Sequence, residues 1–189
     1  MSKEDWKSNT IDKIFKDLYP KKVGSILDLA CGISCKSQYL KANIKIGVDI
    51  YRPYLEKARS DYNGVLVNYD ITHIEDLFLP KSFDVILLLD VVEHLAKNVA
   101  FNLITKCEKI AKKAVIIETP KGYVPQNIDI WGLGGDYYQT HRSEWYPLDF
   151  EQIKYEYRVR DYKMQEVRRH TDINDIETNI QMIDAIKLL

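Results

Sequence analysis

The sequence has little of several features that define large protein classes. Its 189 residues include three cysteines, eight glycines and six prolines. Three cysteines are too few for a disulfide framework and their number is odd, which favours a reducing, cytoplasmic setting. No apolar run approaches the roughly 18 residues of a membrane-spanning helix, and the N-terminal residues resemble neither a signal peptide nor a lipidation signal. We therefore expect a cytoplasmic protein without a membrane segment.

An excess of one charge is also lacking. Lys and Arg total 27 and Asp and Glu total 28, which gives a formal net charge of -1. This balance argues against a general attraction to nucleic acids. One local basic run leaves a phosphate-bearing acceptor open, and it consists of Arg158, Arg160, Lys163, Arg168, Arg169 and His170. The length predicts a single domain over residues 1–189, large enough to bury a core.

Short apolar runs alternate with helical patterns as far as residue 120. A helix is predicted over about residues 5–19, where apolar side chains recur at helical spacing before Pro20. The runs predicted as strands are residues 25–30, 44–48, 65–67, 84–89 and 114–117. The helices predicted between them cover residues 36–42, a segment starting at Pro53, and residues 95–111. Strands that are apolar on both faces and alternate with helices indicate a doubly wound, parallel α/β sheet.

Residues 121–147 break this rhythm with glycines, prolines and aromatic side chains. A segment of that length in a compact domain is usually functional, and we expect a lid-like loop. A short helix is predicted over residues 148–153. Two antiparallel strands are then predicted, separated by a loop over residues 168–179. A bulge or turn is predicted near Arg160 and Asp161, because the apolar alternation slips there.

Acidic residues lie at the ends of four successive predicted strands. Asp28 precedes a turn of small residues that includes Ala30, Gly32 and Ser34, and the other three are Asp49, Asp70 and Asp90. Ligands of doubly wound sheets bind at the carboxyl ends of the strands, and a carboxylate at the position of Asp49 can accept both hydroxyls of a ribose. A lone Asp after a strand is more often a helix cap or turn residue. Four in register make coincidence a poor explanation.

At these residues the sequence resembles the class I methyltransferases that use S-adenosylmethionine. The matching segments are residues 27–32, 47–50, 69–71 and 83–95. The resemblance implies a Rossmann-like, seven-stranded, mostly parallel sheet that ends in an antiparallel hairpin. It also implies S-adenosylmethionine as cofactor. A dinucleotide site is the main competitor on this fold, but it requires Gly-x-Gly-x-x-Gly, and only Gly32 is present.

The resemblance also assigns cofactor contacts by position. Asp28 and the turn containing Ala30, Cys31, Gly32 and Ser34 would face the methionine part. Asp49 would bind the ribose and Ile50 the adenine, which Asp70 and Ile71 would flank. Asp90 and Val91 would line the methionine side, at the entrance to the acceptor pocket. The family usually has glycine where Ala30 and Ser34 stand, and we expect these small side chains to preserve close approach.

Two histidines are candidates for a catalytic role beside Asp90. His94 follows Glu93 near the start of a long predicted helix, and His141 lies in the 121–147 loop. An unperturbed histidine pKa of ~6.5 suits proton transfer, although both residues have ordinary structural explanations. No cysteine or histidine pattern has zinc-ligand spacing, so we expect no metal.

The methyl acceptor is not encoded in any recognisable motif. Nearly the whole chain is used by the expected fold, so the default acceptor is a small molecule bound under the 121–147 loop. Two alternatives remain: a non-catalytic cofactor-binding or scaffold module, and an enzyme that modifies RNA or DNA. The sequence gives no oligomeric state.

Overall fold

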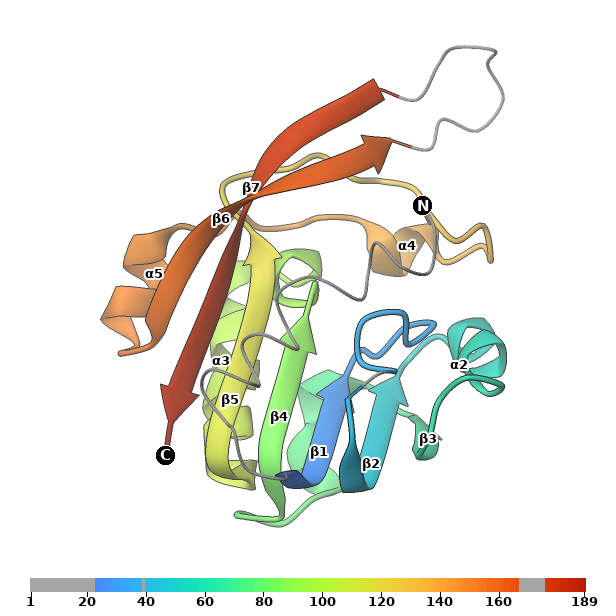
Figure 1. Ribbon diagram of the computed structural model, residues 1–189, viewed down its shortest axis with the longest axis vertical. Helices are drawn as coiled ribbons and strands as arrows, with labels where there is room; N and C mark the ends of the chain where they lie inside the picture. The colour runs from blue at the N-terminus through green and yellow to red at the C-terminus, as the bar shows by residue number, and fades with distance from the viewer. Residues whose placement is uncertain (1–22, 39, 167–175) are drawn as a thin grey trace.

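The computed structural model describes residues 23–38, 40–166 and 176–189 (Figure 1). The helix predicted over residues 5–19 and the first part of the predicted 168–179 loop lie outside this part of the chain. No helix in the described ranges is long and apolar enough to span a membrane.

Seven strands form one sheet in the order β3-β2-β1-β4-β5-β7-β6. Their bounds are β1 Val23–Leu29, β2 Ala42–Asp49, β3 Val65–Asn68, β4 Phe83–Leu89, β5 Ala111–Pro120, β6 Glu156–Glu166 and β7 Ile176–Leu188. The first five strands pair in parallel, and β7 pairs antiparallel with both β5 and β6. The expected Rossmann-like, mostly parallel sheet with an antiparallel C-terminal hairpin is confirmed. Strand order reverses between β1 and β4, and there the carboxyl ends of the parallel strands meet at one edge (Figure 1).

The helix predicted over residues 36–42 is wrong. Residues 35–38 form turns, and Ala42 already pairs with Val23 at the start of β2. Because β2 begins two residues earlier than the apolar run suggested, too little chain is left for a helix. The side chains of Lys36 and Ser37 instead make contacts at the carboxyl edge of the sheet.

The predicted bulge or turn near Arg160 and Asp161 is also wrong, because the β6–β7 register is continuous from Glu156 to Glu166. β6 lies at the edge of the sheet, where neither of its faces needs to be uniformly apolar. Tyr157 and Val159 are more than a third exposed, whereas Arg160 turns toward buried acids. The apolar alternation of β6 is irregular because apolar side chains are partly exposed while a charged side chain faces buried acids.

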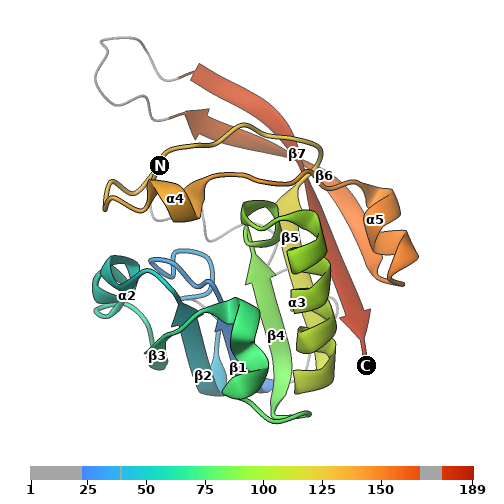
Figure 2. The same cartoon turned by 180° about the vertical axis from the view of Figure 1, so that it is seen from behind.

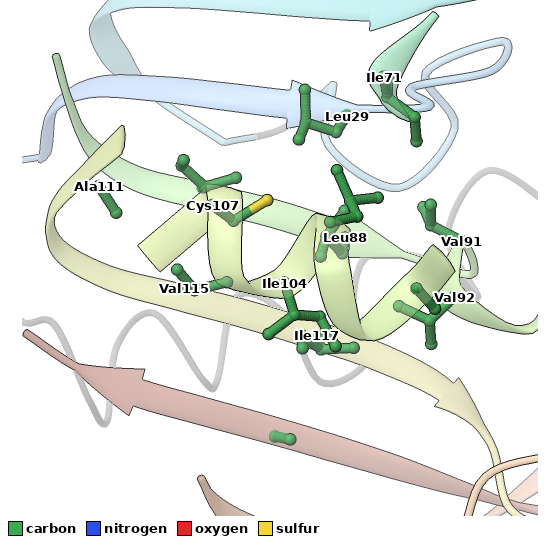
Figure 3. Packing of buried hydrophobic residues seen from close by; sticks show 14 of the residues in the cluster. Leu29, Ile71, Leu88, Val91, Val92, Ile104, Cys107, Ala111, Val115 and Ile117 are labelled. Atoms are coloured by element: carbon green, nitrogen blue, oxygen red, sulfur yellow. The ribbon is translucent and has the colours of Figure 1, made fainter. Parts of the chain in front are cut away.

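The helices between the strands match most of the expected segments. α3, Lys97–Ile110, covers one face of β4 and β5 (Figure 2). Its Ile104 and Cys107 pack against Val115 and Ile117 of the sheet (Figure 3). The remaining helices are α2 Arg52–Ala58, α4 Asp136–Gln139 and α5 Pro147–Gln152, with short 3-10 helices η1 Ile71–Asp76 and η2 Val92–His94. A second apolar cluster on the opposite face of the sheet includes Ile26, Leu87 and Ile116.

Candidate functional site

The turn after β1 has the backbone conformation that its small residues suggested. Ala30, Gly32 and Ser34 have φ values of +50°, +53° and +67°. This left-handed region favours glycine and costs an L-residue about 1–2 kcal/mol. Ala30 and Ser34 therefore have a backbone conformation that glycine adopts more readily. Ser34 is 1% exposed, and its Oγ has no partner within the described residues.

Asp49, at the end of β2, holds two turns together. Its Oδ2 accepts the Gly32 N–H at 2.9 Å, and its Oδ1 accepts the Tyr51 N–H at 2.8 Å. Burial raises the pKa of Asp49 above its usual value, and these two backbone donors partly offset that effect. The carboxylate therefore lies between the β1 turn and the start of α2.

Asp28 lies beneath the same turn and is 3% exposed. Burial raises the pKa of Asp28 to about 7, although the Ser37 hydroxyl donates to its Oδ2 and Lys45 is nearby. Cys31 is enclosed beside it, where burial and the charges of Asp28 and Asp49 raise the pKa of its thiol. Cys31 is therefore a thiol rather than a reactive thiolate, as expected for a small apolar side chain.

The outer predicted contacts occupy three different environments. Ile50 is 41% exposed at the strand ends. Asp70 caps η1, where its Oδ1 accepts from the Thr72 N–H at 2.9 Å and from the Thr72 hydroxyl. Ile71 and Val91 are buried in the main core cluster.

The 121–147 segment crosses the carboxyl ends of the strands, with α4 above β2 (Figure 1). Burial would raise the pKa of Asp129, but the N–H groups of Gly135, Trp131 and Leu133 donate to its carboxylate and lower it. The turn formed in this way presses the Trp131 ring against the Cα of Gly32, where a Cβ would stand 2.4 Å from the ring.

Aromatic contacts extend this packing toward α2. Trp131 meets Tyr54 edge-on, with ring centroids 4.7 Å apart. Tyr51 stacks at a tilt on Tyr138, and its hydroxyl donates to the Leu133 carbonyl at 2.8 Å. The glycine at position 135 lets the chain pass close to the Tyr54 ring. The expected lid is therefore a packed layer over the first turn.

Charged side chains dominate the ends of β4 and β5. Lys36 pairs with both Asp90 and Glu118, and Arg160 pairs with Glu118 at 2.9 Å and with Asp184 at 3.0 Å. Glu118 and Asp184 are 3% and 4% exposed. Sequence reasoning identified Asp90 but missed Lys36, Glu118 and Asp184, because their pairing joins the β1 turn, β5 and the hairpin.

Beside Asp90, the two candidate histidines lie together. Their ring centroids are 4.7 Å apart. Burial lowers the pKa of His94 to about 4, with His141 adding to the effect, and burial also lowers the pKa of His141. Each Nδ1 contacts a backbone carbonyl, that of Thr140 at 3.4 Å for His94 and that of Val124 at 2.5 Å for His141. Both rings are therefore neutral, with Nδ1 as the donor.

Glu93 completes this group and was not singled out from the sequence. It is 2% exposed, and its Oε2 accepts from the Thr119 hydroxyl at 2.8 Å. Burial, with the negative charge of Asp90 adding to it, raises the pKa of Glu93. One potential ligand atom from each of Glu93, His94 and His141 lies within 4.8 Å of the others. The adjacent Glu-His pair after an acidic strand end was the available sequence signal.

Comparison with known proteins gives this geometry a context. Residues 27–117 match a family model described as a methyltransferase domain. A search of curated proteins found no match.

Three solved structures illustrate the likeness of the fold. A methyltransferase of Bacillus halodurans, described as putative, has a TM-score of 0.67 at 12% identity over 94% of this chain and 97% of that one. An Archaeoglobus fulgidus S-adenosylmethionine-dependent methyltransferase has a TM-score of 0.61 at 19% identity, over 98% and 95%. The Synechocystis magnesium protoporphyrin IX methyltransferase with bound S-adenosylmethionine has a TM-score of 0.59 at 14% identity, over 98% and 79%.

The matched segment includes the β1 turn, Asp49 and the Asp90–His94 segment, so motif and geometry agree. Residues 27–117 match a methyltransferase domain, and the chain as a whole has the fold of solved S-adenosylmethionine-dependent methyltransferases.

Proposed function

We propose that this protein transfers a methyl group from S-adenosylmethionine to a small-molecule acceptor at the ends of β4 and β5. The observation that carries the small-molecule assignment is the enclosure of the strand ends by the 121–147 segment. Trp131 packs directly on Gly32, and Arg142 donates to the His94 carbonyl at 2.9 Å. An acceptor under such a layer is small enough to be enclosed, as in the small-molecule sites of other enzymes.

The residues at the β1 and β2 ends fit the cofactor. The turn keeps its left-handed conformation at Ala30, Gly32 and Ser34, and the buried Ser34 Oγ lacks a partner within the described residues. Each Asp49 oxygen accepts one backbone N–H and retains capacity for a hydroxyl group. Asp28, the Ala30–Ser34 turn and Asp49 would hold the cofactor, which supplies an electrophilic methyl group when bound. Ile50, Asp70 and Ile71 remain the proposed adenine neighbours, and Val91 remains a proposed neighbour of the methionine part.

We place Asp90, His94 and His141 on the acceptor side. A general base is most effective when its pKa lies near the working pH. Burial lowers the pKa of His94 to about 4, so this ring is a poor proton acceptor at neutral pH. We therefore propose that the two histidines bind and orient rather than remove a proton. The layer over the site would exclude bulk water from the transfer.

The nucleic-acid alternative loses part of its support. Arg158 and Arg160, two cations of the basic run, are engaged by Asp184, and Arg160 also pairs with Glu118. Cations that neutralise buried acids contribute little to phosphate binding. We also propose a cytoplasmic location, which the free thiols of Cys31, Cys35 and Cys107 support.

Transfer of a labelled methyl group tests this function. Purified protein would be incubated with methyl-labelled S-adenosylmethionine and a cell extract divided by size into small-molecule, RNA and protein fractions. We expect label in the small-molecule fraction and none with Asp49→Ala, while the control Asp61→Ala, at an exposed position, keeps activity. Label confined to RNA or protein would contradict the small-molecule assignment. Absence of transfer to every fraction would favour the scaffold alternative.

A further inference from the structure

We propose that Glu93, His94 and His141 form a binding site for a divalent transition-metal ion such as Zn²⁺. Their candidate ligand atoms all lie within 4.8 Å of one another, a spacing that one ion can bridge. Two imidazole nitrogens and one carboxylate oxygen form a donor set that zinc accepts in sites with an open coordination position. The absence of zinc-ligand spacing in the sequence is explained by the fold, because His141 comes from the 121–147 segment.

The buried carboxylate of Glu93 supports this assignment. Glu93 is 2% exposed and makes no ion pair with any described residue. Thr119 donates to its Oε2, whereas its Oε1 is buried with no partner in the described part of the chain. A buried carboxylate is normally paired or coordinates a metal. Thr119 would then orient the carboxylate while Oε1 meets the ion.

The two histidines have the tautomer that leaves Nε2 available as a metal ligand. A carbonyl oxygen can only accept a hydrogen bond, so the Nδ1 atoms that face the Val124 and Thr140 carbonyls carry the proton. Each Nε2 therefore presents a lone pair. Ligating histidines commonly donate their second N–H to a backbone carbonyl, which fixes the tautomer and the ring orientation.

Backbone contacts hold the three residues in register. The N–H groups of Arg142 and Ser143 donate to the Glu93 carbonyl at 2.7 and 3.1 Å. The Arg142 side chain donates to the carbonyls of His94 and Thr140, both at 2.9 Å. These bonds join η2 to the 121–147 segment. These hydrogen bonds therefore preorganise Glu93, His94 and His141 for binding an ion.

Asp90 adds a second carboxylate on the same side. Its Oδ2 pairs with Lys36, while its Oδ1 is buried without a partner within the described residues. Its charge acts on Glu93, His94 and His141 alike. An open position on a metal ion binds oxygen and lowers the pKa of a bound hydroxyl group. This part of the inference rests on the proposed function: an ion held by Glu93, His94 and His141 would offer such a position on the acceptor side of the site.

Calorimetric titration of the untagged, chelator-treated protein with Zn²⁺ alone tests the site. We expect one ion per chain in the wild type and at least ~10-fold weaker binding in Glu93→Gln and in His141→Gln. The exposed His73→Gln variant is the matched control and should bind like the wild type. Absorption of Co²⁺ gives an independent signature of a nitrogen and oxygen site. No binding by the wild type, or equal binding by Glu93→Gln and His141→Gln, would overturn the proposal.

S-adenosylmethionine binding, measured on the same samples, keeps this test separate from methyl transfer. The shape-conserving Glu93→Gln change leaves the β1 turn and Asp49 intact, so this variant should still bind the cofactor and thereby show that it is folded. Zn²⁺ binding without cofactor binding would contradict the proposed function and leave the metal site standing. Cofactor binding by a wild-type protein that takes up no Zn²⁺ would overturn the metal site alone.

Discussion

At the ends of β1 and β2, backbone N–H groups hold the key side chains in place, whereas at the ends of β4 and β5 side chains hold one another. Asp49 accepts from the N–H groups of Gly32 and Tyr51. Glu118, in contrast, is held by Lys36 and Arg160. The first arrangement is local and follows from a short motif. The second depends on segments that only the folded sheet brings together.

The largest expected effect comes from breaking the ion pairs at the ends of β4 and β5. Glu118→Ala would leave Lys36 and Arg160 without a shared buried partner, and removing one member of a buried pair costs about 3–5 kcal/mol of unfolding free energy. Glu56→Ala is the control, because the Arg52–Glu56 pair is exposed and such pairs contribute roughly 0–1 kcal/mol. Urea unfolding measures both. Equal losses in the two variants would show that the network does not stabilise the fold.

The next prediction concerns Asp28, the buried acid beneath the turn after β1. Burial raises the pKa of Asp28 to about 7 from 3.8, so its protonated form is favoured by folding. The stability that this group contributes is fully present below pH ~4 and is lost as the pH rises toward about 7, by up to roughly 1.4 kcal/mol per unit. Asp28→Asn removes this dependence. Urea unfolding at pH 5 and pH 8 should show the variant gaining on the wild type at the higher pH, and a difference independent of pH would contradict the assignment.

A smaller effect tests whether the 121–147 segment encloses the cofactor. Trp131→Ala removes the ring that covers Gly32, and we expect S-adenosylmethionine to dissociate about tenfold faster. Stopped-flow competition measures this rate. Tyr123→Ala, at an exposed position of the same segment, should leave it unchanged. Equal rates for wild type and Trp131→Ala would mean that the segment does not enclose the cofactor.

The smallest effect concerns the first turn. Ala30 has a φ of +50°, and glycine would relieve a strain of about 1–2 kcal/mol while adding about 0.5–1 kcal/mol of chain entropy cost. Ala30→Gly should therefore stabilise the protein by about 0.5 kcal/mol. Ala100→Gly, inside α3, should destabilise it by about 1 kcal/mol. Thermal unfolding compares them, and destabilisation by Ala30→Gly would argue against strain at this turn.

The same contrast explains what the sequence could predict. Apolar runs and the residues that end them locate the strands, the β1 turn and Asp49, because these features are local. The predicted helix over residues 36–42 is wrong because pairing with β1 makes β2 begin at Ala42. The apolar run alone does not indicate this early start. The grouping of Glu93 with His141, and of Lys36 with Glu118, requires the strand order and the path of the 121–147 segment. No local pattern encodes those distances.

Calorimetric titration with S-adenosylmethionine tests the central claim most directly, with NAD as the comparison ligand. We expect one site of micromolar affinity for S-adenosylmethionine in the wild type, no binding of NAD, and loss of the site in Asp49→Ala. A folded wild-type protein that does not bind S-adenosylmethionine, or an Asp49→Ala variant with unchanged affinity, would contradict it.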